Sequence, residues 1–444
     1  MNRSVTILVC LAVWGVPAAT HAFWPFSTSP RPQQQPPDAV SRTERAKKDE
    51  KVLDKKPVHE EPISIGKVEK AAKDGSAVAQ VILGQMYFTG QGGVKQNYEK
   101  AAKWFKLAAD QGNVRGEFNY AICLDEGYGV PKNPDQALEW YSRAADKGLL
   151  PAQTNAALGY ERKKDTDHTL KFFRMAADQG DTASMRRVAT MLLEEGSDPQ
   201  KAATAAEYLQ KAAAKADVRA EVTLADLYQK GLGVTRDYQE MLRWLWLAAE
   251  DGDAEAQAKL AFCFAEGIGV ARDTIMAFKW FRTSAEAGYP AAQIALGNCY
   301  LDGKGTDRNL EESVKWFRRA AAQGDASGEF SLAVAYGLGR GIAKDEKEAF
   351  RLFKSAAEKG YPPAQFNVGT YYEDGVGTAA DLAEAARWYT AAARQNSTRA
   401  LVALGQCYLA GRGVAVDREK ARECFKRAAD LGSREATDLL KQSF

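Results

Sequence analysis

The chain has 444 residues, of which 45% are apolar, 27% charged and 10% aromatic, a composition typical of folded proteins that excludes wholesale disorder. Lysine and arginine together number 60 against 58 for aspartate and glutamate, so the charge is nearly balanced. This balance argues against a protein dominated by binding to nucleic acid or anionic membranes, which usually shows a marked basic excess.

Residues 1–22 are typical of an export signal. Arg3 precedes an apolar stretch from Val5 to Val16, and small residues then lead to Ala22. A positive start, a short apolar core and small residues at the cleavage point define such signals. Because a membrane-spanning helix needs about 20 apolar residues, we expect cleavage after Ala22 rather than retention as an anchor. The mature protein would then be periplasmic or secreted, without stable membrane insertion.

Residues 23–62 predict a tether. The stretch is rich in proline and glutamine and then becomes a mixed-charge run. Such a composition cannot bury enough apolar surface to offset the entropy of an ordered chain. A disordered spacer is one interpretation, and the other is that the aromatic segment from Phe23 to Phe26 docks on another surface.

Residues 63–444 repeat one pattern. A small residue opens each unit, and consecutive starts lie 36 or 37 residues apart, with one interval of 31. A tiny side chain follows most starts by five residues, and a mostly aromatic position follows by eight. The starts are Ala79, Gly116, Ala152, Ala183, Ala220, Ala256, Ala292, Gly328, Ala364, Ala400 and Ala436. Self-similarity at a fixed period of this length is the signature of a stacked repeat protein.

Each unit predicts two helices. In the unit that begins at Ala292, apolar residues recur at helical spacing as far as Tyr300, and Gly303 and Gly305 then break the helix. The second helix begins after an Asp or Asn, whose side chain can accept a hydrogen bond from the first turn. A glycine such as Gly112 ends it. The capping residues are Asn97, Asn133, Asp237, Asp273, Asn309, Asp345, Asp381 and Asp417.

The recurring pattern is A-x-x-x-L-G-x-x-Y, then G-x-G-V-x-x-D, then A-x-x-W-F-x-x-A-A-x-x-G. It resembles the Sel-like repeat (SLR) family, a relative of the tetratricopeptide repeats. The resemblance implies an all-α fold, a right-handed α/α superhelical solenoid of about ten helix pairs that binds other proteins. Stacking of units leads to the same architecture, because a lone helix pair cannot bury its apolar face. Half-repeats at residues 63–75 and 433–444 are expected to cap the ends.

Two units depart from the pattern. The third, from Ala152, lacks the Gly-x-Gly segment, although Asp165 still precedes its second helix. The fourth, from Ala183, places Arg186 and Arg187 where its neighbours have a small or polar residue and leucine. One interpretation is sequence drift that bends the stack, and the other is a kink or a docking site in the middle of the molecule.

We expect no catalytic, metal-binding or cofactor-binding residues. The recurrent Gly-x-Gly turns are interpreted as helix breakers, since the chain has no G-x-x-x-x-G-K-[ST] motif. Outside the signal, the histidines are His59 and His168, which do not have metal-ligand spacing, and no two cysteines form C-x-x-C.

Four cysteines share one position of the repeat, seven residues after a start, where other units place apolar side chains. They are Cys123, Cys263, Cys299 and Cys407, and we expect them in the core. In the cysteine-rich bacterial branch of the family, paired cysteines bridge neighbouring helices, and some members have penicillin-binding or β-lactamase activity. The bridging positions hold Ala or Gln here, so the resemblance does not extend to that branch. A bridge between Cys407 and Cys424 stays open.

The first-helix face is the candidate binding surface, which lines the concave side by analogy with tetratricopeptide stacks. Polar side chains that vary between units lie three or six residues after the starts, and side-chain amides can hydrogen-bond an extended peptide. The candidate residues are Asn119, Asn155, Asp226, Asn298, Asn367 and Gln406. Ordinary solvated surface is the alternative. The regular run from Ala220 to Gly432 is the expected main platform.

The sequence therefore predicts an exported, non-enzymatic scaffold that binds a protein or peptide partner and acts as adaptor or regulator, with no nucleic acid among its partners. Two alternatives stay open. One is a cell-envelope enzyme that acts on peptidoglycan or a β-lactam, and the other is a purely structural spacer.

Overall fold

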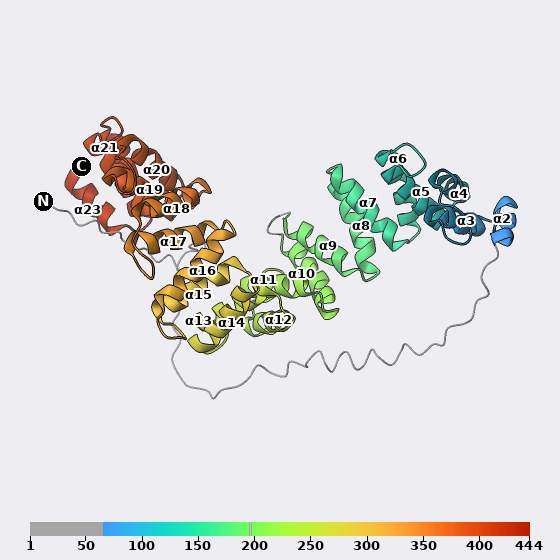
Figure 1. Ribbon diagram of the computed structural model, residues 1–444, viewed down its shortest axis with the longest axis horizontal. Helices are drawn as coiled ribbons and strands as arrows, with labels where there is room; N and C mark the ends of the chain where they lie inside the picture. Colours follow the sequence, from blue (N-terminus) through green and yellow to red (C-terminus); the bar gives the residue numbers. More distant parts are fainter. Residues whose placement is uncertain (1–64, 195, 197) are drawn as a thin grey trace. The chain divides into compact units, whose positions relative to one another are not determined.

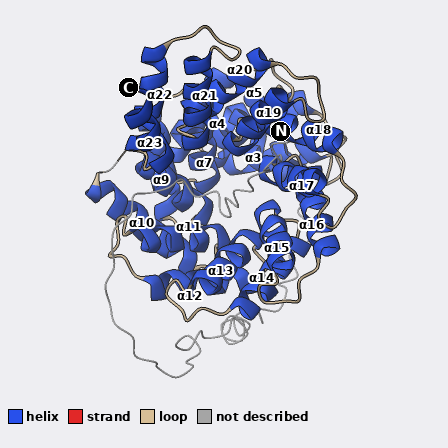
Figure 2. Ribbon diagram, turned by 90° about the vertical axis from the view of Figure 1, so that its left-hand side faces the viewer, coloured by secondary structure: helices blue, strands red, loops and turns tan. Residues whose placement is uncertain are grey.

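The computed structural model describes residues 65–194, 196 and 198–444. The predicted signal peptide and tether lie outside these residues. Within them the chain forms 22 helices and no strand (Figures 1 and 2). The helices are α2 (Ile65–Lys73), α3 (Ala77–Thr89), α4 (Tyr98–Asp110), α5 (Val114–Glu126), α6 (Pro134–Asp146), α7 (Leu150–Arg162), α8 (Thr166–Asp178), α9 (Thr182–Glu194), α10 (Pro199–Ala214), α11 (Val218–Lys230), α12 (Tyr238–Glu250), α13 (Ala254–Glu266), α14 (Thr274–Glu286), α15 (Pro290–Asp302), α16 (Leu310–Ala322), α17 (Ala326–Leu338), α18 (Glu346–Glu358), α19 (Pro362–Asp374), α20 (Leu382–Arg394), α21 (Thr398–Ala410), α22 (Arg418–Asp430) and α23 (Arg434–Ser443).

Ten consecutive helix pairs make up the fold, from α3 with α4 to α21 with α22 (Figure 1). In each pair, the earlier helix is the first helix of its repeat and the later one is the second helix. Helices that are adjacent along the chain pack on each other from α2 to α11 and from α13 to α23. Single helices lie at both ends, with α2 packed on α3 and α23 packed on α22. The structure confirms an all-α solenoid of helix pairs.

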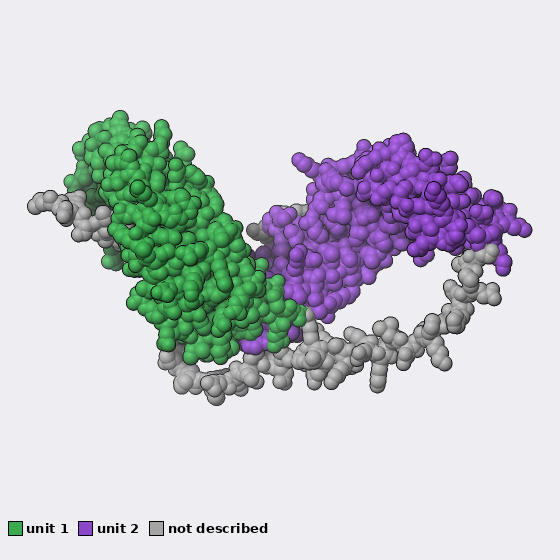
Figure 3. All heavy atoms as spheres, viewed as in Figure 1, with its two compact units in different colours: residues 1–32, 249–444 green, residues 33–248 purple. Residues whose placement is uncertain are grey.

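The chain divides into two compact units (Figure 3). The described part of the N-terminal unit ends at Ala248, and the C-terminal unit runs from Ala249 to Phe444. The division falls inside α12 (Tyr238–Glu250), within the predicted platform, so each unit is described by itself. No helix in the described ranges is long and apolar enough to cross a bilayer.

Local capping explains where the helices begin and end. Asn97 Oδ1 accepts a hydrogen bond from Lys100 N at 2.9 Å, and Asn309 accepts one from Glu312 N at 3.0 Å in the same way. At the other end of α4, Gly112 has φ +77° and donates its N–H to the carbonyl of Ala109 at 2.8 Å. Glycine suits this left-handed position because it has no Cβ. The caps predicted from the sequence are confirmed.

The core of each repeat consists of alanines and aromatic rings. Gly297 of α15 lies against Phe317 of α16, so closely that a Cβ on Gly297 would be 2.5 Å from the ring carbon Cε1. Gly369 of α19 has the same relation to Tyr389 of α20. Phe317 and Tyr389 are both buried. The structure confirms that these two glycines mark a close approach between the helices of a pair.

The register predicted for the fourth repeat is wrong by one residue. The capping residue of α9 is Asp181, whose carboxylate accepts from Ser184 N at 2.8 Å, so Ser184 and not Ala183 is its opening residue. Val188 then fills the buried position where other repeats have leucine, and its side chain is 0% exposed. Arg186 instead forms an ion pair with Asp217 at 3.0 Å, and Arg187 pairs with Glu161. The two arginines therefore do not interrupt the core.

The five cysteines in the described part of the chain are all buried and free. Cys123, Cys263, Cys299 and Cys407 lie in the core as expected, and Cys424 joins them. Cys407 and Cys424, the pair that the sequence left open, do not form a disulfide.

Candidate binding site

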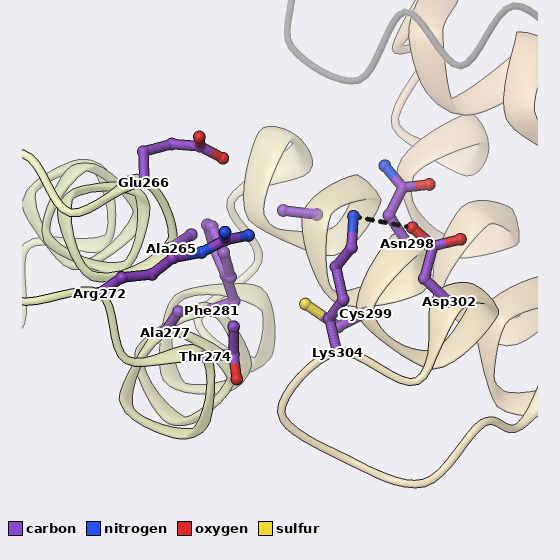
Figure 4. Close-up of a pocket in the computed structure, with 11 residues that line it drawn as sticks. Ala265, Glu266, Arg272, Thr274, Ala277, Phe281, Asn298, Cys299, Asp302 and Lys304 are labelled. Atoms are coloured by element: carbon purple, nitrogen blue, oxygen red, sulfur yellow. Dashed lines mark ion pairs between the residues drawn. The ribbon is translucent and has the colours of Figure 1, made fainter.

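Asn298 lies at the edge of a small pocket in the C-terminal unit. It is half-buried on α15, six residues after Ala292. The pocket has a volume of about 50 Å³ and lies between the end of α13, the start of α14 and the end of α15 (Figure 4). This volume fits a water molecule or the tip of a side chain rather than a whole ligand.

The pocket has an apolar floor and a charged rim. Buried Ala277, Phe281 and Cys299 form the floor, and exposed Glu266 and Arg272 lie at the rim (Figure 4). Lys304 and Asp302 form an ion pair at the rim, with Lys304 Nζ 3.1 Å from Asp302 Oδ2. Asn298 and Asp302 are one helical turn apart, so the amide lies beside this ion pair (Figure 4). Both signs of charge and one amide thus surround an apolar floor.

The thiol in the floor of this pocket is not activated. Burial raises the pKa of the Cys299 thiol to about 11, so the thiol is protonated at neutral pH and is a poor nucleophile. The residues described by the structure contain no group of three or more His, Cys, Asp or Glu side chains that could hold a metal ion. What the pocket offers is an apolar contact flanked by hydrogen-bonding and charged groups.

The structure distributes the six predicted residues over separate repeats and does not gather them at one point. All six are half-buried on first helices, three of them at the third and three at the sixth position after the start of the repeat. Asn298, Asn367 and Gln406 belong to the C-terminal unit, and Asn119, Asn155 and Asp226 to the N-terminal unit. Asn155 forms a side-chain hydrogen bond with Tyr141, so its amide is partly engaged within the fold.

The repeat pattern matches a known family along most of the chain. The Sel1 repeat profile matches ten consecutive segments, which are residues 77–113, 114–149, 151–181, 182–217, 218–253, 254–289, 290–325, 326–361, 362–397 and 398–433. The chain belongs to the Sel1 repeat family. The fourth segment begins at residue 182, two residues before Ser184, which agrees with the corrected register.

Two solved Sel1-type structures are similar to the chain. One is c5321, a protective antigen of uropathogenic Escherichia coli strains with an SLR fold, at 30% identity and a TM-score of 0.54 over 86% of this chain and 91% of that one. The other is a Sel1 repeat protein from Oxalobacter formigenes, at 29% identity and a TM-score of 0.50 over 55% of this chain and 96% of that one. No curated protein sequence matches the chain significantly. Sel1 repeat solenoids are typically non-enzymatic scaffolds of protein interaction.

Sequence reasoning missed a larger pocket in the N-terminal unit. It lies at the start of α6 and beside the end of α7, and it has a volume of about 320 Å³. Gly159 and Arg162 of the third Sel1 repeat line it together with Leu138 of the second. The signal in the sequence was the shortened third repeat, for which a docking site was one of two interpretations.

Proposed function

We propose that this Sel1 repeat protein is an exported, non-enzymatic scaffold that binds a protein or peptide partner through the faces of its first helices. It would act as an adaptor or regulator in the periplasm or outside the cell. Membership of the Sel1 family and the solenoid of helix pairs support partner binding, and the export signal expected at residues 1–22 supports the location. Cell-wall chemistry is the alternative that the experiments below must exclude.

The observation that carries this proposal is a set of amides without hydrogen-bond partners on three first helices of the C-terminal unit, α15, α19 and α21. Asn298, Asn367 and Gln406 are half-buried, and their side chains have no hydrogen-bond partner among the described residues. An amide has both a donor and an acceptor, so it can pair with the backbone of an extended peptide. A face that only filled space would not need these groups, which differ from repeat to repeat.

The test is capture of the native partner by crosslinking in the cell envelope. The amount captured by the wild type is compared with the amount captured by a double variant that carries Asn298→Ala and Asn367→Ala. The variant should fold normally, because substitutions at partly exposed sites change stability by about 0.5 kcal/mol or less. Its crosslinked partner should be lost or strongly reduced. The control carries Arg318→Ala and Arg394→Ala at exposed positions of second helices and should capture the partner normally.

Three results would contradict the proposal. If the double variant captures the partner normally while changes in Phe23 to Phe26 abolish capture, the tether and not the first-helix face binds the partner. If no partner is captured and the purified protein turns over a peptidoglycan or β-lactam substrate, the protein is an enzyme. If the protein retains residues 1–22 and stays in the cytoplasm, the export proposal is wrong.

A further inference from the structure

In six repeats, the Gly-x-Gly turn covers the beginning of the preceding second helix. The second glycine of the turn lies so close to the backbone of that helix that a Cβ would overlap it. Gly305, for example, lies on Thr274 at the start of α14. The six glycines are Gly129, Gly233, Gly305, Gly341, Gly377 and Gly413, and they lie on α4, α10, α14, α16, α18 and α20. Each turn therefore completes the surface of the repeat before its own.

The residue after the second glycine anchors the turn. It is apolar and β-branched in several repeats, and in four of them the structure packs it, partly buried, against the core. These four are Val130, Val234, Ile342 and Val414. The normal occupant of this place is thus a tight glycine turn followed by a β-branched side chain, which is Val or Ile in four of the six repeats and threonine in the other two, Thr306 and Thr378.

The third repeat has no such turn, and α6 is left uncovered. Only Lys163 and Lys164 separate the end of α7 from Asp165, the capping residue of α8. The pocket at the start of α6 has a volume of about 320 Å³, compared with about 50 Å³ for the equivalent place on α14, which Gly305 covers. A volume of roughly 300 Å³ or more is that of a ligand-binding pocket.

The pocket at α6 combines an apolar floor with an excess of positive charge. Pro134, Leu138 and Gly159 form its apolar part. On the rim, Lys163 Nζ pairs with Asp135 Oδ1 at 2.6 Å, and Arg162 lies 3.8 Å from Asp125. The third cation, Lys132, is exposed and forms no ion pair among the described residues. A partner that fills the floor would gain from a carboxylate next to Lys132.

We propose that the pocket at the start of α6 binds a turn of a partner protein with the chemistry of the missing one: Gly-x-Gly, a β-branched residue, and a carboxylate that faces Lys132. This assignment rests on the proposed function and gives it a site and a class of ligand. The other repeats show which turn fills the same place, and the unpaired Lys132 gives the sign of the partner's charge.

The probe is the synthetic peptide acetyl-Glu-Gly-Tyr-Gly-Val-Pro-amide, which has the sequence of residues 126–131 in the second repeat. Binding to the full mature chain is followed by backbone amide chemical shifts up to ~5 mM peptide, which detects weak affinity. The amide signals of Leu138 and Gly159 should shift with saturation, and those of Gly297 and Asn298 should not. Unmoved signals at Leu138 and Gly159 would overturn the proposal.

Two variants test the same pocket by different means. In the first, Gly-Tyr-Gly-Val-Pro-Lys replaces Lys163 and Lys164, which restores the turn of a complete repeat and should abolish peptide binding. In the second, Lys132→Ser should weaken binding about two- to fivefold, the range for one exposed ion pair. Lys304→Ser, on the rim of the small pocket at α14, is the matched control and should bind as wild type. Unchanged peptide binding in the turn-restored chain would also overturn the proposal. If the turn-restored chain does not fold, the peptide affinity of Lys132→Ser decides between the two outcomes.

Capture of the native partner then separates this proposal from the proposed function. If the turn-restored chain folds and captures the partner as wild type does, the scaffold function stands and the α6 pocket is not its site. If the peptide shifts Leu138 and Gly159 but wild type captures no partner, the pocket is confirmed as a turn-binding site and the scaffold proposal fails.

Discussion

Lys359 Nζ lies 2.7 Å from Glu329 Oε1, although the two residues are thirty positions apart and the Glu329 side chain is only 10% exposed. Lys359 also donates to the carbonyl of Gly324 at 2.9 Å. In the neighbouring repeats a glutamine pair makes the same two bonds. Gln323 donates to Gln293 Oε1 at 2.9 Å and to the carbonyl of Gly288 at 3.0 Å. Repeats are therefore linked by either a Glu–Lys or a Gln–Gln pair at one position.

This equivalence predicts a compensating pair of substitutions. Lys359→Gln alone should destabilise the protein by about 1–3 kcal/mol, because Glu329 stays buried as a carboxylate without its ammonium. Adding Glu329→Gln should recover most of the loss, because the double variant reproduces the Gln293–Gln323 arrangement. Urea unfolding of the two single variants and the double variant measures the coupling. Additive losses would show that the two side chains do not act as a pair.

Ala216 is predicted to be a site where glycine stabilises. It follows α10 with φ +64°, at the position where Gly112 follows α4 with φ +77°. A left-handed conformation costs an alanine about 1 kcal/mol relative to glycine. Ala216→Gly should therefore raise the free energy of unfolding by about that amount, since Ala216 is exposed and loses no packing. Gly112→Ala is the reciprocal variant and should lower it, and a loss in both would contradict the backbone explanation.

Gly297→Leu should destabilise the C-terminal unit by about 1–3 kcal/mol, because the new side chain cannot fit against Phe317. Ala291→Leu on the same helix is the control. Because Ala291 is exposed, this substitution should change the free energy of unfolding by about 0.5 kcal/mol or less. Thermal unfolding compares the two. Equal melting of Gly297→Leu and wild type would show that the helices of this pair do not approach as closely as described.

The buried thiols predict a loss of stability in alkali. Burial raises the pKa of Cys123 and Cys263 to about 12 and that of Cys299 to about 11, above the ordinary value near 9 of the unfolded chain. The folded state therefore holds these protons longer, and its stability is full below pH 9 and falls as pH rises toward 12. Urea unfolding at pH 8 and pH 10.5 should show the decline, and Cys263→Ala should reduce it.

Reactivity gives a second readout of the same thiols. A thiol reagent at pH 8 should label the native protein slowly, and it should label five groups in the denatured, unreduced mature chain. Three labelled groups would reveal a disulfide that the structure does not contain.

The periodic part of the fold could be predicted from the sequence because each repeat carries its own caps. An Asp or Asn before a helix and a glycine after it are local signals, and both are found where expected. The fourth repeat was misread by one residue because Ala183 and Ser184 are both small, so size alone could not set the register. Asp181, three residues before Ser184, is the capping residue that decides it.

The contacts between repeats could not be predicted in the same way. Glu329 and Lys359 both resemble ordinary surface residues in sequence, and only the packing of one repeat on the next brings them together. The pocket at α6 was hidden for a related reason. The missing turn was visible in the third repeat, but the surface that it exposes belongs to the second.

Because each turn covers the repeat before it, the stack has a direction. A duplication that adds a whole repeat supplies a new turn that covers the preceding repeat, and it leaves the existing contacts between repeats intact. Removal of a repeat from the C-terminal side instead exposes the start of the second helix that its turn had covered, whereas removal from the N-terminal side exposes the face of the next first helix, as loss of α4 would expose α5. The gain and loss of repeats thus have different structural consequences at the two ends of the array. A deletion inside one turn is a way to convert a covered contact between two repeats into a binding pocket.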